Sequence, residues 1–137
     1  MIVIDASVLA NALADDGRDG RLARRRLTDG GDLVAPDLVD VETVSVLRRR
    51  WLAGDLTARR FFAAVDDLQA LDLTRFPGLP LMRRAYELRA NVTPYDAVYV
   101  ALAEPLDCTL VTADARLAHA PGITCAVDVL RSENSQV

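Results

Sequence analysis

Four acidic residues, distant along the chain, stand where carboxylates could do chemistry. Asp5 and Asp114 each follow directly on a short apolar run, and Glu42 and Asp96 lie in otherwise apolar stretches. A buried carboxylate is destabilising unless it is paired or binds a cation. Carboxylates gathered in one place also repel one another, which raises their pKa values unless a cation neutralises them. If the fold brings them together, these four acids predict a site for divalent cations.

The chemistry of such a site follows from its donor atoms. Oxygen-only ligands favour Mg²⁺, with Mn²⁺ as a substitute, over zinc. Carboxylates that hold one or two of these ions form the apparatus for phosphodiester hydrolysis, because the ions activate water and stabilise the leaving oxygen. The negative charges of the four candidate acids sum to −4, which equals the formal net charge of the chain. We therefore assign the excess of negative charge to the site itself.

Three of the four acids also have a structural interpretation as helix caps. Asp5 and Asp114 each precede a predicted helix, and aspartate is a favoured N-cap residue. Asp96 lies three residues after Thr93, a spacing that resembles a capping box. The two interpretations are compatible, since one carboxylate oxygen can accept a capping hydrogen bond while the other binds an ion.

Glu42 is harder to explain as a cap. Its helical neighbours Val39 and Val46 belong to a largely apolar face that should point inward. Asp37 and Asp40 already occupy the expected positions of an N-cap and its partner, so Glu42 is not needed there. The alternatives to ion binding are that Glu42 reaches out to solvent or forms a salt bridge.

Strands and helices alternate along the chain. Apolar runs and breakers predict strands over residues 2–4, 33–35, 71–73, 108–112 and 124–127. Helical spacing is found over residues 7–14, 20–27, 37–52, 58–70, 81–90, 95–103 and 115–119. This alternation is typical of an α/β fold whose parallel sheet is covered by helices on both faces. Ligands of such folds bind at the carboxyl ends of the strands, where Asp5 and Asp114 are expected.

The length of 137 residues predicts one domain, over residues 1–131, with a polar tail at 132–137. No apolar run approaches the roughly 20 residues needed to cross a bilayer, and the N-terminus lacks the features of a signal peptide. We therefore expect a cytoplasmic protein that binds no membrane. Cys108 and Cys125 lack zinc-binding spacing and are predicted to be small buried side chains, whereas His119 is predicted at the surface.

All 16 basic residues are arginine. The absence of lysine excludes mechanisms that need an amine, such as Schiff bases and the phosphate-binding loop. The acidic balance argues against a simple basic clamp on nucleic acid, but not against a nuclease whose carboxylates hold cations. Arginine clusters occur at 24–26, 48–50, 59–60 and 83–84. They are candidate phosphate contacts or solvated helix faces. Arg116, two residues from Asp114, is the best single candidate for a substrate contact.

Four segments resemble the acidic motifs of the PIN domain, in the order and at the spacing of that family. They are 3–9 (VIDASVL), 36–42 (PDLVDVE), 93–97 (TPYDA) and 110–114 (LVTAD). The resemblance covers nearly the whole chain, whose size is similar to that of VapC-type toxins of bacterial toxin–antitoxin pairs. It implies a PIN-like three-layer sandwich, with a five-stranded parallel sheet flanked by helices, and a Mg²⁺-dependent endoribonuclease.

The resemblance also implies roles for the four acids. Asp5 and Asp96 would be the principal metal ligands of the catalytic site. Glu42 and Asp114 would complete it. For the partners, the family implies an RNA substrate, a homodimer and a small VapB-like antitoxin that lies across the active site.

Two hydroxyl residues and two rival functions complete the predictions. Ser7 and Thr112 are implied by the resemblance to support the site, by orienting ligands or water. A non-catalytic PIN-like module that binds RNA or protein is one alternative, although the intact acids count against it. An aspartyl-phosphate phosphatase is a remote alternative, because it needs an acid where this chain has Ser7 and a lysine that this chain lacks.

Overall fold

A computed structural model describes residues 1–131 of the chain. Its centre is a five-stranded sheet in which every neighbouring pair of strands is parallel. The strands are β1 (Ile2–Ile4), β2 (Leu33–Pro36), β3 (Thr74–Phe76), β4 (Thr109–Thr112) and β5 (Val127–Val129). Their order across the sheet is β3-β2-β1-β4-β5, so the order reverses between β1 and β4. The predicted α/β fold with five parallel strands is confirmed.

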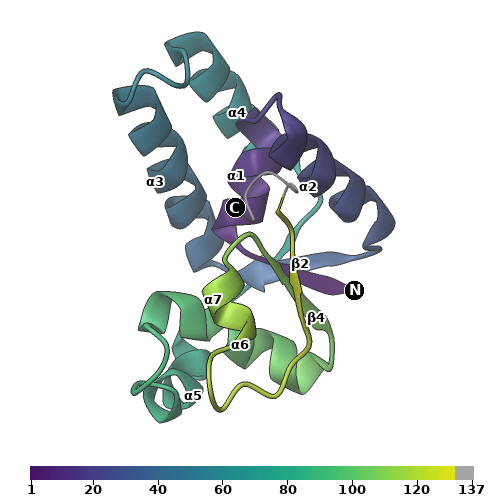
Figure 1. Cartoon of the computed structure of the whole chain (residues 1–137), viewed down its shortest axis with the longest axis vertical. Coiled ribbons are helices and arrows are strands. Elements are labelled where there is room, and N and C mark those ends of the chain that lie inside the picture. Colours follow the sequence, from purple (N-terminus) through teal and green to yellow (C-terminus); the bar gives the residue numbers. More distant parts are fainter. Residues whose placement is uncertain (132–137) are drawn as a thin grey trace.

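Helices cover both faces of this sheet (Figure 1). One side carries α1 (Ala6–Ala14), α2 (Arg18–Asp29), α3 (Leu38–Leu52) and α4 (Ala58–Ala70). The other side carries the short 3-10 helix η1 (Leu79–Leu81), α5 (Met82–Glu87), α6 (Pro94–Leu106) and α7 (Ala115–Ala118). The molecule therefore has three layers, and α3 and α4 extend together away from the sheet (Figure 1).

The core lies where β1 and β4 meet α6. Val3 and Ile4 of β1 and Leu110 and Val111 of β4 are fully buried, as is nearly every side chain of Ala97–Ala103 in α6. Burying a valine, leucine or isoleucine stabilises a fold by about 1.5–3 kcal/mol. In this core α6 is a buried helix, and its packing fixes the positions of the chain segments that follow β1 and β4.

Both edge strands lie later in the chain than predicted. The prediction of a strand at 71–73 is wrong, because β3 begins at Thr74, one residue after the buried Leu73. The prediction of a strand at 124–127 is also wrong in its bounds. The Thr124 backbone N–H donates to the Glu104 carboxylate at 3.0 Å. The strand β5 begins three residues later, at Val127, where it pairs with β4. Edge strands pair on one side only, so few apolar residues reveal them.

The helix predicted over 81–90 is shorter than expected. A 3-10 turn precedes it, and α5 ends at Glu87. Beyond that point the Arg89 backbone N–H donates to the Tyr86 carbonyl at 3.1 Å. This three-residue spacing is the tighter 3-10 pattern that ends many helices.

Three smaller predictions concern single residues and the chain end. Cys108 and Cys125 are free and half-buried rather than fully buried, since they lie at the less enclosed edge beside β5. His119 is exposed, as predicted. Within residues 1–131, no helix is long and apolar enough to cross a membrane. The predicted tail at 132–137 lies outside the described residues.

Candidate active site

The four predicted acids line one pocket, which has a volume of about 330 Å³. Asp5 follows β1, Glu42 comes from α3, Asp96 from the first turn of α6, and Asp114 follows β4. They meet because the carboxyl ends of parallel strands share one edge of the sheet, at the point where strand order reverses. The structure thus brings together all four acids that the sequence singled out.

Asp5 is the most buried of the four acids, with 8% of its surface exposed. Its Oδ1 accepts hydrogen bonds from the Ser7 hydroxyl at 2.6 Å and from the Val8 backbone N–H at 3.2 Å. Its Oδ2 accepts a hydrogen bond from the Thr112 hydroxyl. Burial raises the pKa of Asp5, these hydrogen bonds oppose the rise, and the charge of Asp96 adds to it. Asp5 is therefore both the N-cap of α1 and a desolvated carboxylate in the pocket.

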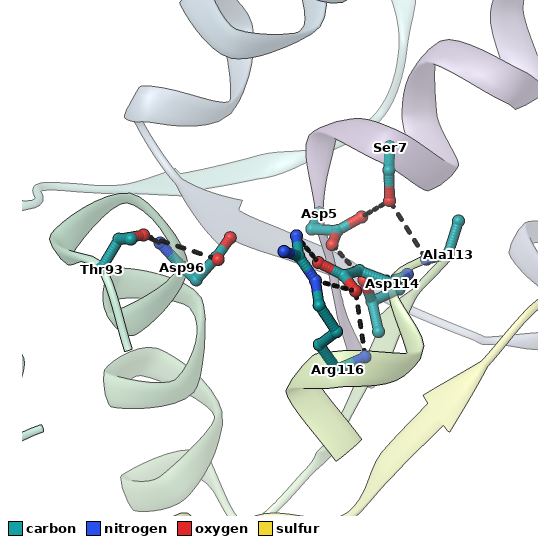
Figure 2. Close-up of polar contacts among 8 residues, drawn as sticks. Asp5, Ser7, Thr93, Asp96, Ala113, Asp114 and Arg116 are labelled. Atoms are coloured by element: carbon teal, nitrogen blue, oxygen red, sulfur yellow. Dashed lines mark hydrogen bonds and ion pairs between the residues drawn. The ribbon is translucent and has the colours of Figure 1, made fainter. Parts of the chain in front are cut away.

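The hydroxyls of Ser7 and Thr112 connect Asp5 to the segment that follows β4. The Ser7 hydroxyl accepts a hydrogen bond from the Ala113 backbone N–H at 3.1 Å (Figure 2). The Thr112 hydroxyl accepts one from the Asp114 backbone N–H at 3.0 Å. Each hydroxyl donates to Asp5 and accepts from the backbone, so its orientation is determined at both ends. The network holds the Asp5 carboxylate in one orientation and fixes the backbone of Asp114.

Glu42 is half-buried, and its Oε1 accepts a hydrogen bond from the Tyr99 hydroxyl at 2.5 Å. Burial raises the pKa of Glu42, the Tyr99 hydrogen bond lowers it, and the charges of Asp96 and Asp5 raise it further. Burial and the same hydrogen bond raise the pKa of Tyr99. The predicted inward orientation of Glu42 is confirmed. Its partner is a phenol, and it has no arginine partner among the described residues.

Sequence reasoning missed Tyr99. A usable signal was present, because Tyr99 follows Asp96 by three residues and so lies on the same side of α6. Tyr99 is only 2% exposed, and a buried tyrosine hydroxyl usually requires a hydrogen-bond partner. A buried tyrosine beside a candidate ligand therefore indicates a hydrogen-bond partner within its reach, which here is Glu42.

The expected caps of α3 are wrong in detail. Asp37 occupies the N-cap position, but its side chain makes no capping hydrogen bond. Asp40 instead accepts from the Arg75 guanidinium, with 3.0 Å between Nη2 and Oδ1. This ion pair joins α3 to the edge strand β3, which local sequence spacing does not reveal.

Asp96 lies in a capped first turn, as the sequence predicts. The Thr93 hydroxyl accepts a hydrogen bond from the Asp96 backbone N–H at 3.3 Å and contacts Asp96 Oδ2 at 3.5 Å (Figure 2). Burial raises the pKa of Asp96, and the charge of Asp114 raises it further, whereas Arg116 opposes the rise. The cap uses the backbone N–H, so the carboxylate still contributes negative charge to the pocket.

Asp114 caps α7 and forms an ion pair with Arg116. Its Oδ1 accepts from the Arg116 backbone N–H at 2.9 Å, and the guanidinium contacts both carboxylate oxygens at 2.9 and 3.1 Å. The Arg116 hydrogen bond lowers the pKa of Asp114, the reverse of the shift at the other three acids. Arg116 was predicted to contact substrate, and here it contacts an acid of the pocket.

The pocket suits a hard divalent cation by its chemistry. Its charged oxygens are all carboxylates, and Asp5, Glu42 and Asp96 have pKa values raised partly by one another or by Asp114. Such mutual repulsion is what a bound cation relieves. Within residues 1–131, no three acids, cysteines or histidines lie close enough together to form a finished ligand cage as they stand. The acids therefore supply donor atoms of the right chemistry for such a cation.

Several arginines of the predicted clusters have structural partners. Salt bridges join Arg26 to Asp128, Arg60 to Asp16 and Arg84 to Glu104. In contrast, Arg49 lines the acidic pocket. Tyr95 lines it as well and is 62% exposed.

Comparison with known proteins places the chain in a family. The PIN domain profile matches residues 2–123. Ribonuclease VapC1 of Mycobacterium tuberculosis is 41% identical over 130 residues, which cover 94% of this chain and 97% of that relative. The chain belongs to the PIN domain family. Another relative, Ribonuclease VapC9 of the same organism, is 42% identical over 130 residues, which cover 95% of this chain and 98% of that relative.

Solved structures show the same PIN-domain fold. The crystal structure of Mycobacterium tuberculosis VapC20, described as a Sarcin-Ricin loop cleaving toxin, superimposes with a TM-score of 0.70 at 17% identity, covering 90% of this chain and 97% of that chain. A toxin–antitoxin complex from Klebsiella pneumoniae gives a TM-score of 0.63 at 16% identity, and the match covers 96% of this chain and 99% of that chain. At these identities the likeness concerns the fold of this PIN domain.

Proposed function

We propose that this PIN-domain protein is the endoribonuclease toxin of a VapBC toxin–antitoxin pair and hydrolyses RNA phosphodiester bonds with Mg²⁺, or with Mn²⁺ as a substitute. The observation that carries the proposal is the convergence of four carboxylates on one pocket. The relatives named ribonuclease VapC1 and VapC9, which this chain matches over nearly its whole length, support the reaction class.

In this proposal the four acids have two different roles. Asp5 and Asp96 would be the principal ligands, and Glu42 and Asp114 would bind a second ion or position the attacking water. Bound Mg²⁺ supplies charge neutralisation at the phosphate and lowers the pKa of water. The raised pKa values of Asp5, Glu42 and Asp96 support this assignment, because burial, and to a smaller extent the charge of neighbouring carboxylates, destabilises their ionised forms and a bound cation would offset both.

The supporting residues act through hydrogen bonds. Ser7 and Thr112 hold both oxygens of Asp5, which leaves the carboxylate little freedom to rotate. Tyr99 holds one oxygen of Glu42 in the same way. Partners of this kind orient the groups that contact an ion, and their loss typically lowers affinity or activity by about 10- to 100-fold.

RNA cleavage by the purified protein tests the proposal. Wild-type protein should cleave RNA with Mg²⁺, and EDTA or Asp96→Asn should abolish cleavage. Asp67→Asn is the matched control, since Asp67 is an exposed acid on α4 that does not line the pocket, and this variant should cleave like the wild type. Asp96 is preferred to Asp5 because its helix cap uses the backbone N–H, which the substitution retains. Cleavage that persists in EDTA and in Asp96→Asn would exclude this mechanism.

The proposed partners are a VapB-like antitoxin and a second copy of this chain. Support for an antitoxin comes from the fold shared with a protein solved in a toxin–antitoxin complex. Support for self-association comes from large exposed apolar side chains, which include Trp51 and Leu52 of α3 and Phe62 of α4. Light scattering of the purified protein tests the homodimer, and a mass equal to one chain at micromolar concentration would contradict it.

A further inference from the structure

Arg116 binds both carboxylate oxygens of Asp114, one of the four candidate metal ligands. Its Nε lies 3.1 Å from Oδ1, and its Nη2 lies 2.9 Å from Oδ2. Oδ1 also accepts the backbone N–H of Arg116 at 2.9 Å. A cation that takes Asp114 as a ligand must therefore compete with a guanidinium already in place.

The guanidinium of Arg116 reaches from Asp114 toward Asp96 (Figure 2). Asp96 lies close enough for its charge to interact with both residues. Asp96 and Asp114 are also shared by the acidic pocket and a neighbouring pocket of about 190 Å³, which Arg116 lines. The positive charge thus stands at the boundary between the two pockets, beside two of the acids that would hold an ion.

The ion pair between Arg116 and Asp114 is of the kind that opens easily. The side chain of Arg116 is 90% exposed, and the contacts of its guanidinium with described residues are all to Asp114. Solvent screens exposed pairs, so they contribute little to stability. A divalent ion carries twice the charge of a guanidinium and approaches oxygen atoms more closely, so it competes effectively for the same carboxylate.

We propose that Arg116 is a built-in counter-ion, which occupies Asp114 in the metal-free protein and which a divalent cation must displace before Asp114 can join the active site. This inference rests on the proposed nuclease function. It assigns Arg116 a positioning role toward Asp114, whose two carboxylate oxygens it contacts. In the metal-free protein, Arg116 would then neutralise the charge of one candidate ligand, Asp114.

Calorimetric titration with Mn²⁺, without RNA, tests the proposal. Arg116→Gln should bind Mn²⁺ about two- to fivefold more tightly than the wild type, the range expected on removing a competing exposed ion pair. Arg83→Gln is the matched control, because Arg83 is an exposed arginine that lines neither pocket. Its substitution changes the net charge by the same amount as Arg116→Gln. It should bind Mn²⁺ within about twofold of the wild type.

The outcomes separate this inference from the proposed function. Tighter binding by Arg116→Gln than by wild type and Arg83→Gln supports the counter-ion. Equal or weaker binding by Arg116→Gln, with wild type still taking up Mn²⁺, overturns the counter-ion and leaves the nuclease proposal intact. No uptake by any of the three proteins overturns both. Thermal denaturation of each variant in EDTA shows that the comparison is between folded proteins.

Discussion

Tyr99→Phe provides a sharp test of how the site is held together. The substitution removes one hydroxyl from a ring that is 2% exposed, and it leaves the packing of that ring unchanged. The lost interaction is the 2.5 Å hydrogen bond to Glu42. Hydrogen bonds to charged groups contribute about 1.5–3 kcal/mol. Glu42 is half-buried and can accept water instead, so we expect the lower end, about 1.5 kcal/mol, or roughly 5 °C in Tm.

The same substitution should affect activity more than stability. Without the phenol, Glu42 loses its fixed orientation, and its pKa rises because the Tyr99 hydrogen bond lowers it. RNA cleavage at fixed Mg²⁺ should therefore fall about tenfold, the lower end of the range for losing a partner of this kind. Raising the pH should recover part of the loss, since Glu42 must be ionised to act.

The matched control is Tyr86→Phe. Tyr86 is 63% exposed, its ring contacts Arg89, and it does not line the acidic pocket. Its loss of a hydroxyl should change stability by less than about 0.5 kcal/mol and leave cleavage unchanged. If Tyr99→Phe matched the wild type in both Tm and cleavage, or if Tyr86→Phe lost as much activity, the assigned role of Tyr99 would be refuted.

Three further predictions concern buried polar groups. Thr112→Val should destabilise the protein by about 2 kcal/mol in urea denaturation, because Asp5 loses a buried donor, and a loss below about 0.5 kcal/mol would contradict this. In EDTA, stability should decrease as pH rises from about 4 through the raised pKa values of Asp5, Glu42 and Asp96, because the folded state there binds more protons than the unfolded state. Mg²⁺ or Asp96→Asn should reduce that decrease, and an unchanged slope would argue against mutual repulsion. Glu104→Gln should cost about 2–3 kcal/mol at pH 7, because ion pairing lowers the pKa of Glu104 from 4.5 to about 2. That cost should disappear as pH falls through this interval, and a pH-independent cost would indicate lost packing instead.

The sequence by itself determined the fold class and the identity of the four acids. Alternating strand and helix patterns are local signals, and parallel strands require crossover helices, so the α/β architecture followed from them. The uniformly apolar stretch around Asp96 indicated a buried helix, which the structure confirms. Asp5 and Asp114 were placed at one sheet edge by the rule for parallel strands, and both line the pocket there.

Only the tertiary structure decided how those acids are held. The contact between Glu42 and Tyr99 spans 57 residues, and the contact between Thr112 and Asp5 spans 107. Which partner each of these residues meets depends on how helices and strands pack, and spacing along the chain does not encode that. The edge strands were misplaced for the same reason, because their position is set by backbone pairing with β2 and β4 rather than by apolar periodicity.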